Sequence, residues 1–351
     1  MPYLAAVSTI DFPYRIDQSA VKAYAQQLFA PSFPGIERLM PAFDNTGIQS
    51  RNFCQPLHYY GQARSFEQQN EDYVSITLEY AVQAIEDCLA QAGTAREAVT
   101  DIIFVSSTGL ATPSMDALLI NRMRLGAHVR RTPVFGLGCA GGVSGFAKAA
   151  MMAQADPAAV VLLVAAELCS LTFLRTDFSK SNLIGASLFA DGIAACLLKG
   201  DAHGTGQVRY RAAQSTLYYD TPEVMGWQFR NDGFKVLFSQ DIPGLVRQHI
   251  GADTGRFLQQ QGLSLADIRN FIFHPGGTKV LDAYRDALQV RDPQFLTHTQ
   301  AVIRDYGNMS APTVLYVLQR FLQQGCSKGY GLMLAMGPGF SSEMVLLDMH
   351  P

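Results

Sequence analysis

The segment Pro133 to Ala150, PVFGLGCAGGVSGFAKAA, places Cys139 in a glycine-rich turn between an apolar run and the start of a predicted helix. The N-terminus of a helix has unpaired N–H groups and partial positive charge, so it stabilises a thiolate and lowers the pKa of a cysteine. Glycines on both sides let a substrate approach the sulfur. The segment therefore predicts a nucleophilic cysteine. The alternative is a buried structural cysteine in a tight turn.

Gly136, Gly138 and Gly141 also satisfy the G-x-G-x-x-G pattern of dinucleotide sites. That pattern requires an acidic residue at the end of the next strand, roughly 20 residues on, to hold a ribose hydroxyl. Asp156 stands at that distance but precedes the next predicted strand, which ends at Glu167. We therefore do not expect the turn to bind a nucleotide.

Two other residues could complete the chemistry of the cysteine. His274, in FIFHPGGTK, follows an apolar strand, and Asn308, in YGNMSAPT, stands just ahead of a predicted helix. A histidine supplies the base or cation that a thiolate needs, and an asparagine amide steadies a developing oxyanion. Taken singly, His274 could be a satisfied core histidine and Asn308 a helix N-cap. With Cys139, they favour capture of an acyl group as a thioester, followed by attack of a carbanion.

A papain-like hydrolase uses the same three residue types in the same order. His274 follows Cys139 within the range of roughly 130 to 150 residues usual in that family. The chain lacks the C-G-[SA]-C-[WY] signature, however, and its cysteine is far from the N-terminus, which argues against a hydrolase. We predict no metal site, because the remaining histidines are scattered without ligand spacing.

Short apolar runs alternate with segments of helical period along the chain. This pattern predicts an α/β protein with largely parallel sheets that are covered on both faces. The runs are residues 101–107, 132–137, 158–167, 271–275 and 331–339, and the clearest helical segments are 73–92 and 313–324.

The order of these elements repeats in the second half of the chain. We therefore predict two copies of one fold, residues 1–205 carrying Cys139 and residues 206–351 carrying His274 and Asn308. Packed with their helices against each other, the copies would form a five-layer α/β/α/β/α body. In this arrangement the three polar residues lie in loops of the same class, at strand ends and helix starts.

Composition restricts the classes of function. The 351 residues carry 27 Lys and Arg against 30 Asp and Glu, so no electrostatic footprint for nucleic acid is visible. Six cysteines without a C-x-x-C pair indicate a reducing compartment. The N-terminus does not resemble a signal peptide, and the longest apolar stretch, 158–166, is too short to span a membrane. We expect a cytoplasmic protein without a membrane span or a nucleic-acid partner.

The motifs around the three polar residues resemble those of the type III polyketide synthases, relatives of plant chalcone synthase with the thiolase fold. They are GCAGG, HPGG, GNMS and GPG, joined by SSTGLATPS, AELCSLTF and SLFADG, in the order and spacing of that family. The resemblance spans nearly the whole chain. It implies a homodimer that needs no cofactor and uses acyl-CoA and malonyl-CoA as substrates.

The resemblance also implies the reaction. Cys139 matches the nucleophile that is loaded with an acyl-CoA starter. His274 and Asn308 match the pair that polarises the malonyl thioester and stabilises the enolate formed on loss of CO₂. Claisen condensation then joins the enolate to the acyl group, and several such rounds precede cyclisation. A thiolate–imidazolium ion pair would explain a reactive sulfur at neutral pH.

A substrate cavity follows from the same resemblance. Phe189 matches one of two phenylalanines that gate the passage from the CoA tunnel, and the other falls on Val236, whose smaller side chain is expected to admit bulkier or longer starters. Thr112 matches a residue that reaches into the partner subunit's cavity. Further cavity-lining positions fall on Ser107, Cys169, Thr172, Gly185, Trp227 and Ser310.

The positions that bind CoA phosphates match only in part. Arg38 keeps a basic group, whereas the other two positions fall on Pro41 and Asn45, and Lys279 is a candidate substitute donor. Cys169 and Trp227 differ from the threonine and glycine of the plant enzymes, which argues against chalcone formation.

Overall the sequence is most similar to bacterial alkylpyrone and alkylresorcinol synthases. That similarity implies a long-chain fatty acyl-CoA starter extended by several malonyl units, with alkylpyrones as product and alkylresorcinols as the alternative product. Two other functions stay open at this point. One is a single-round condensing enzyme of the ketoacyl synthase type, and the other is a non-catalytic acyl-CoA binding protein that has kept the fold.

Overall fold

The computed structural model describes residues 1–33, 35–239 and 241–350, and nine strands there form one mixed sheet. The sheet has the order β11-β12-β13-β8-β1-β7-β6-β4-β5. Its N-terminal strands are β1 (Tyr3–Thr9), β4 (Asp101–Ser106), β5 (Arg130–Phe135), β6 (Val160–Leu168) and β7 (Asp191–Lys199). Its C-terminal strands are β8 (Val208–Leu217), β11 (Ile268–Phe273), β12 (Gly329–Gly337) and β13 (Ser341–Met349). The two sets meet where Tyr3 and Leu4 of β1 pair with Arg209 and Val208 of β8.

Strand directions differ from the sequence-based expectation. β4 is parallel to β5 and β6, and β11 is parallel to β12, whereas the other five ladders of the sheet are antiparallel. The prediction of largely parallel sheets is therefore wrong. Every residue of β6 and nearly every residue of β7 is buried. Strands covered on both faces are continuous apolar runs in either direction, so the sequence pattern does not reveal their polarity.

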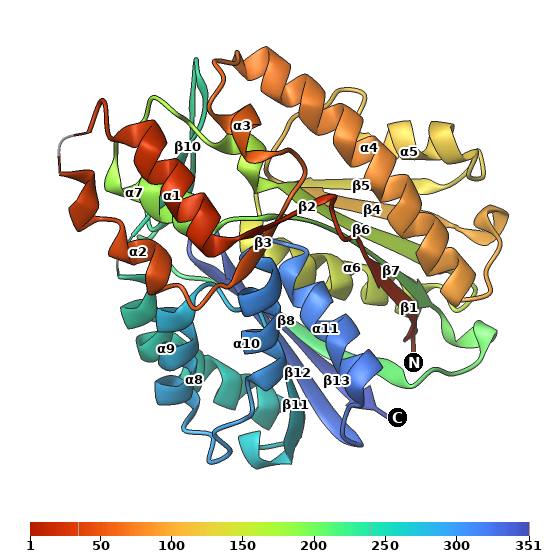
Figure 1. The fold of residues 1–351 in the computed structure, drawn as a ribbon. Helices are drawn as coiled ribbons and strands as arrows, with labels where there is room; N and C mark the ends of the chain where they lie inside the picture. The colour runs from red at the N-terminus through yellow and green to blue at the C-terminus, as the bar shows by residue number, and fades with distance from the viewer. Residues whose placement is uncertain (34, 240, 351) are drawn as a thin grey trace.

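Helices cover both outer faces of the two strand sets and fill the space between them (Figure 1). α4 (Phe66–Gln91) and α5 (Met115–Met123) pack on the outer face of the N-terminal strands. α8 (Ile242–Gln260) and α9 (Thr278–Leu288) pack on the outer face of the C-terminal strands. α6 (Gly141–Ala155) and α11 (Thr313–Gln324) form the central layer. The predicted duplicated thiolase-like α/β fold with five layers is confirmed, while the division at residues 205 and 206, between β7 and β8, stays a prediction.

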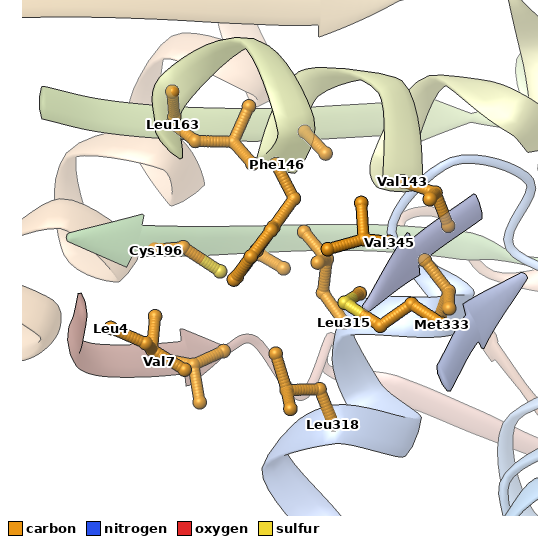
Figure 2. Close-up of a cluster of buried hydrophobic side chains, with 14 of the residues drawn as sticks. Leu4, Val7, Val143, Phe146, Leu163, Cys196, Leu315, Leu318, Met333 and Val345 are labelled. Atoms are coloured by element: carbon orange, nitrogen blue, oxygen red, sulfur yellow. The ribbon is translucent and has the colours of Figure 1, made fainter. Parts of the chain in front are cut away.

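The central layer is a hydrophobic cluster that draws on both halves of the chain. Phe146 of α6 and Leu315 of α11 lie in it together with Leu163 of β6 and Met333 of β12, all essentially inaccessible to solvent (Figure 2). Close packing of this kind leaves little freedom for the helices to shift. Because Cys139 lies just ahead of α6 and Asn308 just ahead of α11, this core fixes the two loops relative to each other.

Helix boundaries agree with the sequence pattern where periodicity is strongest. The predicted helix 313–324 coincides with α11, and the segment 73–92 belongs to α4, which begins earlier, at Phe66. The earlier start has a local cause. Ser65 accepts a hydrogen bond from the Gln68 backbone while the Gln68 side chain accepts one from the Ser65 backbone, forming a capping box.

Smaller elements gather at one end of the molecule, where α1, α2, α7 and β10 lie close together (Figure 1). The smaller elements of the described chain are α1 (Gln18–Phe29), α2 (Pro41–Asp44), α3 (Leu57–Tyr60), α7 (Lys180–Leu188) and α10 (Thr297–Tyr306), and the two-stranded pairs β2 (Tyr14–Asp17) with β3 (Ser50–Phe53) and β9 (Met225–Arg230) with β10 (Gly233–Phe238). Of these, α10 lies beside α11. No helix in the described part of the chain combines the length and the hydropathy that crossing a membrane requires.

Candidate active site

Cys139 lies in a short 3₁₀ turn, Gly138–Ala140, that leads directly into α6. Gly138 has a φ of 46°, a left-handed conformation that glycine adopts without strain. Its N–H donates to Ser107 Oγ over 2.9 Å. Ser107 therefore holds the cysteine turn in place, and its place in the wall of the substrate cavity stays a prediction.

Asn308 follows the end of α10, and its backbone is tied to the segment after α7. Its N–H donates to Leu188 O over 2.9 Å, and Ala190 N–H donates to Asn308 O over 2.8 Å. Its Oδ1 accepts the Ser310 N–H over 2.9 Å. The N-cap of α11 is Pro312, so Asn308 is not a helix cap. Its amide is instead held inside the protein.

His274 extends from the end of β11, where its N–H donates to Leu334 O of β12 over 2.8 Å. The residue is 2 % exposed, and neither ring nitrogen has a hydrogen-bond partner among the described residues. Buried polar groups are normally paired. A satisfied core histidine therefore does not fit the structure, whereas two free ring nitrogens fit a residue that binds a substrate.

The segments that carry the three residues contact one another. Asn308 Nδ2 approaches Gly276 O, two residues after His274, at 3.5 Å. Gly337, at the end of β12, packs so closely on the cysteine turn that a Cβ there would lie 2.6 Å from Ala140 Cβ. The side chains of Asn308 and Ser310 lie close enough to the Cys139 thiol to lower its pKa. The fold thus gathers residues that are far apart in the sequence into one buried site.

Burial dominates the electrostatics of the site. It raises the pKa of the Cys139 thiol to about 12, although the hydrogen bonds with Ser310 and Asn308 oppose the rise. It also lowers the pKa of the His274 imidazole to about 3. Burial disfavours an isolated thiolate on Cys139 and an isolated imidazolium on His274. Burial therefore outweighs the lowering of the thiol pKa that the helix start was expected to give, and a thiolate–imidazolium pair would have to form by proton transfer from Cys139 to His274.

Glu167 is a polar component of the site that sequence reasoning missed. Its carboxylate accepts hydrogen bonds from Ser107 N (2.9 Å) and Thr108 Oγ1 (2.8 Å), and more weakly from Ser310 Oγ (3.4 Å). Complete burial raises its pKa to about 7. Ser310 links it to Cys139. An acidic residue inside the apolar run VVLLVAAEL was the signal that could have revealed it.

A pocket with an empty volume of about 680 Å³, which includes space at its mouth, adjoins the site. Six of the predicted cavity residues line it: Cys169, Thr172, Gly185, Phe189, Trp227 and Val236. Ser107 and Ser310 lie beside the cysteine, and Thr112 is exposed on the surface. Cys139, His274 and Asn308 do not line the pocket. Phe189 connects the two regions, because it lines the pocket and its backbone forms a bridge with Asn308.

The passage at Phe189 has a second aromatic side chain that the sequence comparison did not indicate. Phe238 lies two residues after Val236 on β10, and its ring meets the Phe189 ring edge to face at 6.4 Å. Residues two apart in a strand share a face. The expectation that Val236 alone leaves the passage open is therefore incomplete, because Phe238 restores aromatic bulk next to it.

Arg51 is a second missed residue, and no pattern in the sequence distinguishes it. It is 1 % exposed, lines the pocket, and donates through Nη1 to Ala186 O and Phe189 O over 2.7 and 2.8 Å. Its Nε and Nη2 have no partner among the described residues. Desolvation lowers its pKa to about 9, which leaves the guanidinium charged at neutral pH. It fixes the end of α7 and hence the position of Phe189.

The candidate CoA-binding residues lie on the surface. Arg38 is an exposed residue at the end of a short turn, Ile36–Arg38, and Lys279 is the exposed second residue of α9. Thr278 Oγ1 donates to Asn45 O over 2.9 Å and so joins the start of α9 to the end of α2. Within the described ranges, no cluster of three or more His, Cys, Asp or Glu could hold a metal ion.

Two family models match the chain, both of them domains of the chalcone and stilbene synthases. The N-terminal domain matches residues 56–202 and the C-terminal domain matches residues 209–351. The chain belongs to this family, the type III polyketide synthases. It is therefore an acyltransferase that forms carbon–carbon bonds.

Relatives of the synthase cover almost its whole length. It is 42 % identical to a putative chalcone synthase of Bacillus subtilis strain 168, over 99 % of each chain. It is 37 % identical to 1,3,6,8-tetrahydroxynaphthalene synthase of Streptomyces peucetius subsp. caesius, over 98 % of this chain and 92 % of the relative. The crystal structure of 1,3,6,8-tetrahydroxynaphthalene synthase from Streptomyces coelicolor A3(2), a bacterial type III polyketide synthase, superposes with a TM-score of 0.94 at 28 % identity, covering 99 % of each chain.

Proposed function

We propose that the synthase loads an acyl-CoA starter on Cys139 and extends it with malonyl-CoA in several decarboxylative Claisen condensations. The observation that carries this proposal is a buried thiol close to the Asn308 and Ser310 side chains, next to a pocket lined mainly by apolar and aromatic residues. Transfer of the acyl group forms the Cys139 thioester and releases CoA. The sulfur then holds the acyl group while malonyl-CoA binds.

His274 and Asn308 supply the polar groups for decarboxylation. A neutral imidazole carries one N–H, and neither ring nitrogen of His274 has a partner among the described residues, so the N–H is free to donate to the malonyl thioester oxygen. The Asn308 amide adds a second donor. As CO₂ leaves, the electron pair of the breaking bond forms an enolate whose negative oxygen these donors stabilise. The enolate carbon attacks the acyl carbonyl, and the Cys139 sulfur leaves.

The starter in this proposal is a long-chain fatty acyl-CoA, and the product is an alkylpyrone. Apolar and aromatic residues dominate the pocket lining, which suits an alkyl chain. Lactone formation needs only an enol oxygen as the closing nucleophile. The relative from Streptomyces peucetius is named for tetrahydroxynaphthalene, so that product is the alternative outcome to be tested.

Product analysis tests the proposal directly. Purified protein is incubated with ¹³C-malonyl-CoA and acyl-CoAs from acetyl to palmitoyl, and products are counted for malonyl units by mass spectrometry. Alkylpyrones with two or more malonyl units from long starters support the proposal. One unit per starter would indicate a single-round condensing enzyme. Tetrahydroxynaphthalene from malonyl-CoA alone would overturn the choice of starter.

Trapping of the acyl-enzyme separates catalysis from mere binding. With palmitoyl-CoA and no malonyl-CoA, mass spectrometry of the peptide around Cys139 shows the acyl group. Cys139→Ala abolishes it, whereas Cys326→Ala, a cysteine that lies just after α11, leaves it unchanged. If the Cys139 peptide of the wild type carries no acyl group, the result would point to a non-catalytic acyl-CoA binding protein.

We also propose that the synthase is a homodimer and that Arg38 and Lys279 hold CoA phosphates. Leu110, two residues before Thr112, and Phe135 are large apolar side chains exposed on the single chain, which a partner subunit would cover. Light scattering after size exclusion tests the dimer, and a monomeric mass would contradict it. Alanine at Arg38 and Lys279 is expected to raise KM for acyl-CoA without changing kcat, with an acyl N-acetylcysteamine thioester as the control substrate.

A further inference from the structure

We propose that the alkyl end of the starter lies beneath α1, against a wall made by Val21, Ala25 and Leu28. This inference rests on the proposed function and adds to it a place for the chain that none of the motifs around Cys139 indicates. The pocket extends well beyond the cavity residues predicted from the sequence and reaches α1. The ligand class is an unbranched acyl chain attached to Cys139.

The helix face that borders the pocket is apolar. Val21, Ala25 and Leu28 are spaced by four and three residues, so they lie on one side of α1. The opposite side carries exposed Gln26 and Gln27. Apolar residues at this spacing usually pack against other side chains. Here they also border empty space, which makes them candidates for contact with a ligand.

Small residues keep the space between α1 and α7 open. Ala25 faces it from α1, and Gly185 and Ala186 face it from α7. A Cβ built at Gly185 would meet Phe189 and Val236 at 3.4 and 3.6 Å, which is ordinary contact, so the glycine is not required by a clash. Its effect is to leave room for a ligand beside Phe189.

The pocket borders the active site at Phe189 and Cys169. Phe189 and Cys169 line it, and the Phe189 backbone is bridged to Asn308. A chain attached to Cys139 would therefore pass Phe189 to reach α1. Rotation of the Phe189 ring away from Phe238 is the movement that the proposal requires.

Polar groups are distributed as an acyl thioester would need them. Arg51 is the one charged residue of the pocket lining in the described part of the chain, and its unpartnered Nε and Nη2 are close to Phe189 rather than to solvent. Two buried donors at the inner end fit the keto oxygens that accumulate near the thioester during extension. The apolar wall on α1 fits the alkyl end, which stays farthest from the sulfur.

Chain-length profiles of α1 variants test the inference. In Ala25→Phe and Leu28→Trp the added ring fills the space under α1, and Gln27→Phe places a ring on the exposed side of the same helix as a matched control. The measurement is kcat/KM for acylation of Cys139 with saturated acyl-CoAs from acetyl to stearoyl. For the wild type we expect kcat/KM to rise about fourfold with each added methylene, for as long as the added methylene is buried in the pocket.

In Ala25→Phe and Leu28→Trp we expect kcat/KM to stop rising at a shorter acyl chain than in the wild type. The value for acetyl-CoA in these variants, and the whole profile of Gln27→Phe, should equal those of the wild type. Equal losses at every chain length, or profiles like that of the wild type, would overturn the inference. If Ala25→Phe does not fold, Leu28→Trp carries the test, because Leu28 is only half-buried. A wild type without any gain with chain length would overturn the proposed function as well, so the two failures are distinguishable.

Cross-linking gives a second readout that does not depend on rates. Palmitoyl-CoA with a diazirine at its methyl end is loaded on Cys139, irradiated, and the cross-linked peptides are mapped. Labels within residues 18–29 support the inference. Labels at Thr108 or Leu171, which line a neighbouring hollow on the other side of Thr172 and Phe234, would place the chain elsewhere and overturn it.

Discussion

The ring of Phe189 meets the ring of Phe238 edge to face, with centroids 6.4 Å apart and planes at 88°. Phe189 directly follows the last residue of α7, and Phe238 is the last residue of β10, so a helix end and a strand end together hold this aromatic contact beside the pocket. The contact narrows the passage in spite of the small side chain at Val236.

Phe238→Ala is therefore expected to widen this passage. Loss of the ring pair should lower the free energy of unfolding by about 1 kcal/mol. It should also raise kcat/KM for a bulky aromatic starter such as benzoyl-CoA relative to hexanoyl-CoA. Val236→Phe, which adds a ring beside the pair, is the opposite variant and should lower the same ratio. An unchanged ratio in both variants would show that these side chains do not control access.

The pH dependence of Cys139 alkylation reports the state of the thiol. Burial raises the pKa of the thiol to about 12, so below that value the thiolate fraction grows about tenfold per pH unit. The rate of alkylation by iodoacetamide, followed on the Cys139 peptide by mass spectrometry, should increase without a plateau between pH 6 and 9. A plateau across that range would demonstrate a stable ion pair with His274.

Glu167 should make stability depend on pH in a definite direction. Its pKa is raised from 4.5 to about 7 by burial, so between these values the folded protein binds more protons than the unfolded chain. The free energy of unfolding contributed by this group is therefore largest below pH 4.5 and is lost as pH rises through 7, by about 3 kcal/mol.

Glu167→Gln removes that contribution. In urea unfolding, the free energy of unfolding of the variant relative to that of the wild type should be higher at pH 8 than at pH 5. Glu86→Gln, at an exposed position on α4, controls for the change in surface charge. A difference between wild type and Glu167→Gln that is the same at both pH values would contradict the prediction.

Gly142 permits the close approach of α6 to the segment ahead of α11. A Cβ at this position would lie 2.2 Å from Ala311 O and 2.7 Å from Val314 Cγ1. The first of these is a backbone atom that cannot rotate away. Gly142→Ala should therefore destabilise the protein by about 1–3 kcal/mol and reduce acylation of Cys139, because the two loops are forced apart.

Gly255→Ala is the matched control for that substitution. Gly255 lies inside α8, and a Cβ there meets nothing within 4 Å. Alanine has the higher helix propensity, so this variant should be as stable as the wild type or up to about 1 kcal/mol more stable. Thermal unfolding of both variants checks the pair. Equal losses of stability in Gly142→Ala and Gly255→Ala would mean that the destabilisation by Gly142→Ala does not come from the contact with Ala311.

Much of the fold was readable from the sequence because it depends on local patterns. Apolar periodicity predicted α11 at its observed bounds, and the repeated order of elements predicted a duplicated α/β body. Cys139, His274 and Asn308 stood out because each combines a reactive side chain with turn residues at a strand end or ahead of a helix. These signals lie within a few residues of each position, so a single sequence contains them.

The tertiary structure alone decided the features that arise where distant segments meet. β6 and β7 are buried along almost their whole length and are mainly apolar, so their antiparallel pairing became visible only in the folded sheet. Phe238, Arg51 and the α1 face have no motif, because their importance comes from neighbours that lie far away in the sequence. The pKa of Cys139 also depended on the fold. A helix start stabilises a thiolate in any chain, but only the packed interior determines how much water the sulfur loses.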